Sequence, residues 1–271
     1  KPIMEFINVS GMEMNSIVPA DYSFYTKLHI LVQEPLDFMD METLGLMRSI
    51  GIEKGKPFNP DARMKKILED AVAIGEGIAR TVTYYPRQEG QFAWNDPGSG
   101  WVVPFADHDA SWRTEEGVRK IENQMYYHYN CIVVTPVMAK APGPGKGSEY
   151  VFKSFDANND ILIGAENYEM TLPADVPVAD FWAITLYDTQ TRSQLQTDQQ
   201  FPTIDTYSKG LKKNSDGSLT LYFGPEAPEG KESNWLQTIP GKSFFVCLRM
   251  YGPTEPWIEG KWRPGDVKLL K

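Results

Sequence analysis

The stretch FWAITLYDTQTRSQLQTDQQFP, residues 181–202, decides the fold that we expect for this chain. Its first seven residues are rich in aromatic and β-branched side chains, which is the composition of a buried strand. The sequence then changes at Asp188 into a mostly polar segment that ends at Pro202. A buried strand that delivers Asp188, Arg192 and several amides to one end of a sheet predicts a functional site at that end.

Further segments of the C-terminal half have the same composition and are separated by turn sequences. They are residues 150–155, 168–172, 219–223, 244–251 and 267–270. No helical pattern lies between these segments, and short connections favour antiparallel pairing. We therefore expect residues 146–271 to form a jelly-roll-like antiparallel β-sandwich.

Side-chain alternation in the segment 244–251 predicts which residues face the core of that sandwich. One face carries Phe244, Val246, Leu248 and Met250, and the other carries Phe245, Cys247, Arg249 and Tyr251. Arg249 thus lies on a largely apolar face. A buried arginine needs a carboxylate partner, and Asp188 or Asp198 is the expected one. The pair would be a structural clamp or the base of a polar pocket.

Residues 1–145 are predicted to form a helical connecting region with an aromatic loop, so the fold class is α+β. Helical patterns begin at Asp21, at Asp40 and after Asn59, which is expected to cap the third helix. In this third helix, apolar positions from Met64 to Val82 mark one face, which we expect to be directed at a core. A fourth helix is predicted from Thr114, with His128 as a core histidine.

The loop between the third and fourth predicted helices, residues 86–113, contains the sequence Asp107-His108-Asp109. A carboxylate beside a histidine can orient the ring and raise its pKa, as a general base requires. The competing interpretation is a solvated turn, since adjacent side chains seldom point together. A similar choice applies to residues 156–160, where alternating oxygen ligands resemble the start of a calcium loop but also fit an ordinary β-turn.

Composition excludes several classes of function. The chain has 27 Lys plus Arg against 36 Asp plus Glu, a net charge of −9, and no basic run. This balance argues against a nucleic-acid partner, and no apolar run approaches the ~20 residues of a membrane span. Cys131 and Cys247 fit no metal-ligand spacing, although a disulfide between them stays open. The common motifs of serine hydrolases, nucleotide-binding proteins and zinc proteases are absent, and we expect no cofactor or metal.

Four ordered motifs give the chain a resemblance to a known family. They are GIEKGKPF at 51–58, FWAITLYD with the TRS and TDQQFP that follow, NSDGSLTLYFGPEAPEGKESNWLQTIPGK at 214–242, and LRMYGP at 248–253. Together they resemble the DUF1254/DUF1214 proteins over essentially the whole chain. The resemblance implies the helical connection plus the C-terminal DUF1214 sandwich, with the N-terminal DUF1254 domain largely absent. It also implies export, to the periplasm or out of the cell.

Three hypotheses for function follow. In the first, the protein binds a small molecule or glycan in a cleft at the end of the sandwich. The ligand-binding residues would be Arg192, Asn234, Trp235, Arg249 and Tyr251, beside Asp188.

The second hypothesis is a hydrolase in which Asp188, or the pair Asp107 and His108, acts as general base. Arg192 or Arg249 would then stabilise developing negative charge. The third is an assembly module whose helical face, residues 61–82, packs on the missing domain or on another subunit, so we expect a homo-oligomer.

Overall fold

The computed structural model describes residues 6–13, 17–34, 39–87, 89–131 and 143–270. The chain divides into two compact units, residues 1–78 and residues 79–271. Helices dominate the N-terminal half and strands the C-terminal half, which confirms the predicted α+β class.

The first unit is built from α1 (Ser23–Val32), α2 (Met41–Ser49) and most of α3 (Ala62–Tyr84). Its small core contains Tyr25, Val32, Ile52 and Leu68. Asp40 caps α2 as predicted, since its carboxylate accepts a 2.9 Å hydrogen bond from the backbone N–H of Thr43.

Helix α3 corrects two sequence predictions. Its N-terminal cap is Asp61 rather than Asn59, because the Asp61 carboxylate accepts the backbone N–H of Met64 at 2.7 Å. Its apolar face is also less buried than expected, with Ile67, Ile74 and Ile78 exposed. The face was predicted to lie against a core along its whole length.

The fourth helix starts later than its sequence pattern predicts. Helix α4 comprises Ile121–Asn130. The preceding residues form a turn in which Gly117 has a φ of +87° and the N–H of Thr114 bonds to the carbonyl of Val118. A glycine with positive φ is incompatible with a continuing right-handed helix, so the helix cannot begin at Thr114. His128 on α4 is exposed, not a core residue.

The aromatic loop contains short 3-10 helices. These are η1 (Glu89–Gln91), η2 (Ala93–Asn95), η3 (Pro97–Ser99) and η4 (Ala106–His108). Trp101, Phe105 and Trp112 of this loop are buried, so the loop packs against the body of the second unit.

Two four-stranded sheets form the body of the second unit. The first has the order β1 (Ser148–Lys153), β7 (Phe244–Pro253), β3 (Val178–Asp188) and β4 (Thr203–Asp205). The second has the order β6 (Trp235–Gln237), β5 (Leu219–Gly224), β2 (Tyr168–Leu172) and β8 (Lys268–Leu269). All pairs are antiparallel except β5 with β6. The short strands β4 and β6 were not predicted.

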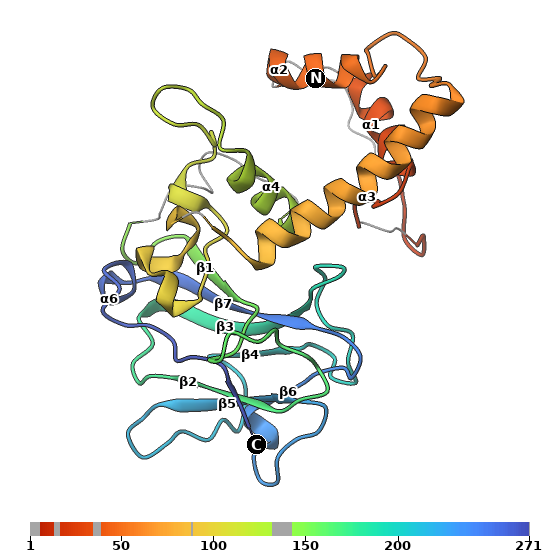
Figure 1. Cartoon of the computed structure of the whole chain (residues 1–271). Coiled ribbons are helices and arrows are strands. Elements are labelled where there is room, and N and C mark those ends of the chain that lie inside the picture. The colour runs from red at the N-terminus through yellow and green to blue at the C-terminus, as the bar shows by residue number, and fades with distance from the viewer. Residues whose placement is uncertain (1–5, 14–16, 35–38, 88, 132–142, 271) are drawn as a thin grey trace. The chain divides into compact units, whose positions relative to one another are not determined.

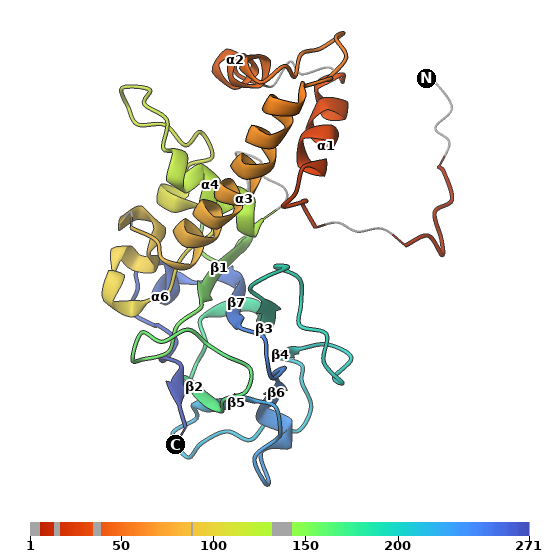
Figure 2. The same cartoon turned by 45° about the vertical axis from the view of Figure 1, so that its right-hand side comes forward.

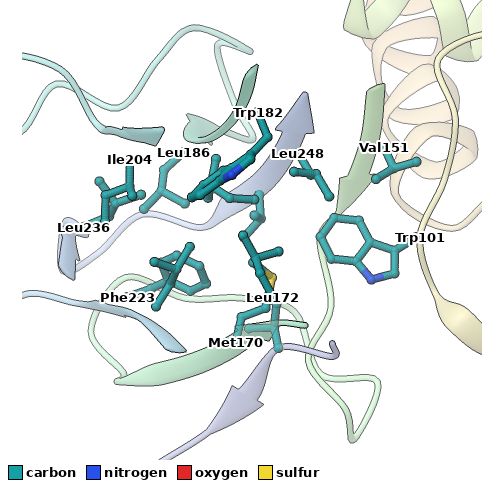
Figure 3. Close-up of a cluster of buried hydrophobic side chains, with 14 of the residues drawn as sticks. Trp101, Val151, Met170, Leu172, Trp182, Leu186, Ile204, Phe223, Leu236 and Leu248 are labelled. Carbon is teal, nitrogen blue, oxygen red and sulfur yellow. The ribbon is translucent and has the colours of Figure 1, made fainter. Parts of the chain in front are cut away.

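The main core lies between these two sheets. Trp182, Leu186 and Leu248 of the first sheet and Met170, Leu172 and Phe223 of the second point into one cluster, which Trp101 of the aromatic loop joins (Figure 3). The strand β7 behaves as its alternation predicts, because Phe244, Val246, Leu248 and Met250 all belong to this core. Its other face is therefore directed away from the second sheet.

Elements from the N-terminal side of the second unit cover that other face. In Figures 1 and 2 the sheet β1-β7-β3-β4 lies between the second sheet and α4. Two short helices complete the unit, η5 (Glu232–Asn234) and α6 (Glu255–Ile258). In the part of the chain that the structure describes, no helix combines the length and the apolar character needed to cross a bilayer.

Candidate functional site

A cavity of about 230 Å³ lies on the outer face of the first sheet. Strands β1, β3 and β7 supply its floor with Tyr150, Phe152, Tyr187, Phe245, Cys247 and Arg249. These positions alternate with the core positions of the same strands, so the pleat of the sheet separates floor from core. Phe105 of the aromatic loop and Tyr127 and Cys131 at the end of α4 form its other side. We call this the Arg249 cavity.

Arg249 sits among aromatic rings at the centre of the floor. Its guanidinium lies 5.6 Å from the centre of the Tyr150 ring and 5.7 Å from that of Tyr187. The hydroxyl of Tyr187 accepts a hydrogen bond from Nη2. The Nε atom is buried and has no hydrogen-bond partner among the described residues. A donor in this state is costly, unless a ligand accepts from it.

Arg192 brings a second positive charge to the same cavity. Its guanidinium stacks 4.0 Å from the centre of the Tyr129 ring, and Nη1 donates to the carbonyl of Gln190 at 2.7 Å. Its backbone has a φ of +59°, a conformation that costs a non-glycine residue energy. The tight turn after β3 thus fixes the direction of this side chain.

No carboxylate in the described part of the second unit forms an ion pair with Arg249 or Arg192. Ion pairs of this unit are formed by other basic residues, among them Arg87, Lys120, Lys153, Lys242, Lys261 and Arg263. The segment that follows Cys131 in the sequence, residues 132–142, contains neither Asp nor Glu. The predicted partnership of Arg249 with Asp188 or Asp198 is therefore wrong, and the cavity carries net positive charge.

Asp188 has a structural role at the end of β3. Its carboxylate accepts the Lys242 ammonium at 2.5 Å and the backbone N–H of Gln190 at 2.7 Å. Burial raises the pKa of Asp188, but these hydrogen bonds outweigh burial and leave the pKa below its ordinary value. Asp188 pairs with Phe244 while Arg249 pairs with Ala183, five positions earlier on β3. That offset is about 16 Å along the strand, so Asp188 does not pair with Arg249, although the cavity itself extends to this end of the sheet through Tyr187 and Arg192.

Asn234 and Trp235 do not line the Arg249 cavity and serve the second sheet instead. The Asn234 side chain is buried and bonds to both backbone groups of Lys212 and to the carbonyl of Thr220. The indole N–H of Trp235 donates to the carbonyl of Gly224 at 2.9 Å. Both side chains hold loops onto strands, so the sequence prediction that they join Arg192 in one cleft is wrong.

Tyr251 lies beside the Arg249 cavity on the same face of β7. Its ring stacks on Phe181 at 4.1 Å and meets Tyr150 edge to face at 6.4 Å. Tyr150 and Tyr187 were not among the predicted site residues. The alternation of aromatic residues in their own strands, applied as it was to β7, would have indicated them.

The predicted pair Asp107 and His108 lines a different cavity, of about 390 Å³. Glu149 of β1, together with Trp94, Phe92 and Trp257, lines the same space. The carboxylate of Asp107 pairs with the Lys120 ammonium at 2.8 Å. We call this the Glu149 cavity, because burial raises the pKa of Glu149 to about 7.

The two cysteines are free thiols, and both line the Arg249 cavity. Burial raises the pKa of Cys131 to about 12 and that of Cys247 to about 11. The thiols are therefore neutral and poorly nucleophilic at neutral pH.

The calcium-loop interpretation of residues 156–160 gives way to the turn. The Asp156 carboxylate accepts the backbone N–H groups of Asn158 and Asp160, and Asn159 has a φ of +66°. Across the described ranges, no group of three or more His, Cys, Asp or Glu side chains has the arrangement of a metal site.

Comparison with known proteins finds one family match, in the C-terminal half of the chain. Residues 147–255 match the model of the family described as "Protein of unknown function (DUF1214)". No curated protein matches the chain.

Two solved structures resemble the chain. The VPA0106 protein of Vibrio parahaemolyticus is 18% identical over 100% of this chain, with a TM-score of 0.45. An uncharacterised protein from Burkholderia cenocepacia is 15% identical over 80% of this chain, with a TM-score of 0.40. The chain covers 59% of the first protein and 46% of the second, less than two thirds of either.

Proposed function

We propose that this chain, which contains a DUF1214 domain, binds a small organic anion with an aromatic or apolar body in the Arg249 cavity. The observation that carries the proposal is the Arg249 guanidinium, which is partly buried and has no carboxylate partner among the described residues of its unit. A guanidinium stays charged at any ordinary pH, so its counter-charge has to come from elsewhere. A bound carboxylate would supply that charge and accept the unpartnered Nε–H.

The walls of the cavity favour an apolar ligand body. Phe105, Phe152 and Phe245 line it together with two thiols that burial keeps neutral. Apolar walls with a few placed polar groups are typical of small-molecule sites. A glycan, which needs many hydrogen bonds, fits such walls less well than a compact aromatic acid does.

Arg192 supports the same ligand class. Its guanidinium enters the cavity from the turn after β3 and is held by Tyr129 and the carbonyl of Gln190. A positively charged group that is positioned before the ligand arrives loses little entropy on binding. We infer that Arg192 contacts the anion or its apolar body from the side opposite the sheet.

The hydrolase hypothesis has weaker support. Each aspartate proposed as general base already has an ammonium partner, Lys242 for Asp188 and Lys120 for Asp107. Such a partner stabilises the ionised carboxylate and makes it a poorer proton acceptor. The exported location and the DUF1254 partner domain stay predictions of the sequence resemblance, and the homo-oligomer stays a prediction from the apolar helical face at residues 61–82.

Thermal unfolding of the full chain with benzoate, phenylacetate and the uncharged control benzyl alcohol tests the proposal. We expect the two acids to raise Tm in a dose-dependent way and benzyl alcohol to leave it unchanged. The Arg249→Met variant should lose the shift. The matched control Arg48→Gln removes an exposed arginine of the first unit and should keep it.

Two outcomes would contradict the proposal. One is an unchanged benzoate shift in Arg249→Met, measured on a variant whose circular dichroism matches that of the parent. The other is a rise in Tm with benzyl alcohol equal to that with the acids. This result would mean that the cavity binds the apolar body of the ligand and does not recognise its charge.

A further inference from the structure

We propose that the Glu149 cavity is a second ligand site, which takes a small organic cation such as a primary amine with an aromatic or aliphatic body. The cavity measures about 390 Å³ and is distinct from the Arg249 cavity. Glu149 and Val151 of β1 line it, while Tyr150 and Phe152 of the same strand line the other. Alternation along one strand thus places the two sites on opposite faces of β1.

The charge distribution around the cavity favours a positively charged ligand. Among the described residues, no lysine or arginine lines it. The only effect on the ionisation of Glu149 is the removal of water by burial, with no hydrogen bond or cation from the described residues to offset it. A desolvated carboxylate without a partner is costly, and a bound ammonium group would supply the missing charge and hydrogen bonds.

The neighbouring charges are already engaged. Asp107 pairs with Lys120 at 2.8 Å, and Arg263, which stacks over Trp94 at 5.1 Å, pairs with Asp96 at 2.5 Å. Neither cation is therefore free to neutralise Glu149. A cation bound in the cavity would therefore be the counter-charge of Glu149.

The aromatic walls suit the body of such a ligand. Trp94 and Trp257 meet edge to face at 5.1 Å, and the Trp94 indole N–H donates to the carbonyl of Trp257 at 3.1 Å. That hydrogen bond and the packing of Trp257, which is buried, hold both rings in place. Fixed aromatic rings beside a carboxylate favour an organic ammonium ion through apolar contact and cation–π attraction.

Isothermal titration of the full chain at pH 8 with benzylamine tests the inference, with benzyl alcohol as the uncharged probe of the same shape. We expect saturable binding of benzylamine and at least a tenfold weaker response to benzyl alcohol. Glu149→Gln should reduce benzylamine affinity at least tenfold. The matched control Glu166→Gln removes an exposed acid and should leave the affinity unchanged.

The pH dependence identifies the group that supplies the negative charge. Benzylamine affinity should fall between pH 8 and pH 6, because Glu149 takes up a proton in this interval. Asp107 and His108 are the other titratable side chains that line the cavity, with Lys120 paired to Asp107. The variant His108→Asn should keep the pH dependence, and its loss there would overturn the assignment to Glu149.

Cross-testing the two sites keeps this inference separate from the proposed function. Arg249→Met should bind benzylamine as the parent does, and Glu149→Gln should keep its benzoate-induced rise in Tm. Equal affinity for benzylamine in Glu149→Gln and in the parent, or equal affinity for benzyl alcohol and benzylamine, would overturn the inference whatever happens at the Arg249 cavity.

Discussion

Glu149 and Tyr150 are neighbours on β1, yet their side chains line different cavities, one that contains a partly buried carboxylate and one that contains two guanidinium groups. Tyr150 stands directly across from Arg249 in the β1–β7 register and offers its ring to the guanidinium. Glu149 points to the other side of the strand, where burial raises its pKa to about 7. One strand therefore separates a guanidinium and a carboxylate that each lack an ion-pair partner among the described residues. The two groups would neutralise each other if their side chains shared a face.

The first prediction concerns Asp188, which we expect to stabilise the fold and not to bind ligand. Asp188→Asn should lower the free energy of unfolding by about 1–3 kcal/mol, the cost of breaking a hydrogen-bonded charge pair of this kind. The value lies in the lower part of the range for ion pairs with buried members because the Lys242 side chain is 45% exposed and solvent screens the pair. Urea unfolding at pH 7 measures the loss.

The pH dependence of the same variant provides its control. The folded-state pKa of Asp188 is below the ordinary value, so its contribution to stability is present at neutral pH and is lost as the pH falls through that lowered pKa. Parent and Asp188→Asn should therefore converge in stability in strong acid. A constant difference from pH 7 down to pH 2 would contradict this role for the carboxylate.

A second prediction separates Asn234 from the ligand sites. Asn234→Ala removes three hydrogen bonds that a buried amide makes with the backbone of Lys212 and Thr220. The backbone groups left without a hydrogen-bond partner should lower the free energy of unfolding by about 1–3 kcal/mol. The variant should still bind benzoate at temperatures below its lowered Tm. Asn158→Ala, at an exposed turn position, serves as the control and should change stability by less than about 0.5 kcal/mol.

A third prediction concerns the backbone contact at Gly164. A Cβ atom at this position would lie 2.2 Å from the carbonyl oxygen of Ile239. The backbone cannot move away easily, because its N–H bonds to Lys242 and its carbonyl accepts the Thr238 hydroxyl. Gly164→Ala should therefore lower stability by about 1–3 kcal/mol or more. Gly143→Ala, where a Cβ meets nothing within 4 Å, should be close to neutral in the same thermal unfolding assay.

A fourth prediction concerns the reactivity of the two thiols. Because burial raises the pKa values of Cys131 and Cys247 to about 12 and about 11, very little thiolate is present at pH 8. Reaction with Ellman's reagent should be slow in the folded protein and should reach two thiols per chain in urea. Fast native labelling at pH 8, at the rate of a small free thiol, would contradict the burial of these groups.

Local sequence patterns predicted much of the fold. The strand β2 was predicted with its observed bounds, and the composition of residues 181–187 identified β3. Alternation in β7 assigned each of its side chains to the correct face. The strands β4 and β6 were missed because each has three residues, too few for a period to show. The start of α4 was predicted too early. Thr114 and the acidic residues after it resemble the first turn of a helix, but Gly117 forms a turn there instead.

What the sequence by itself determined is the α+β class, the order of the longer elements and the face on which Arg249 lies, because periodicity is a property of neighbouring residues. Only the tertiary structure decided which side chains contact one another. Asp188 pairs with Lys242, Asn234 bonds to the backbone of Lys212, and Arg249 lies among aromatic rings with no carboxylate partner in the part of the chain that the structure describes. These partners lie tens of residues apart or come from different strands, and register and loop packing, which no local pattern encodes, bring them together. For the same reason Glu149, an ordinary acid in the sequence, becomes a candidate site residue only once the aromatic loop covers β1.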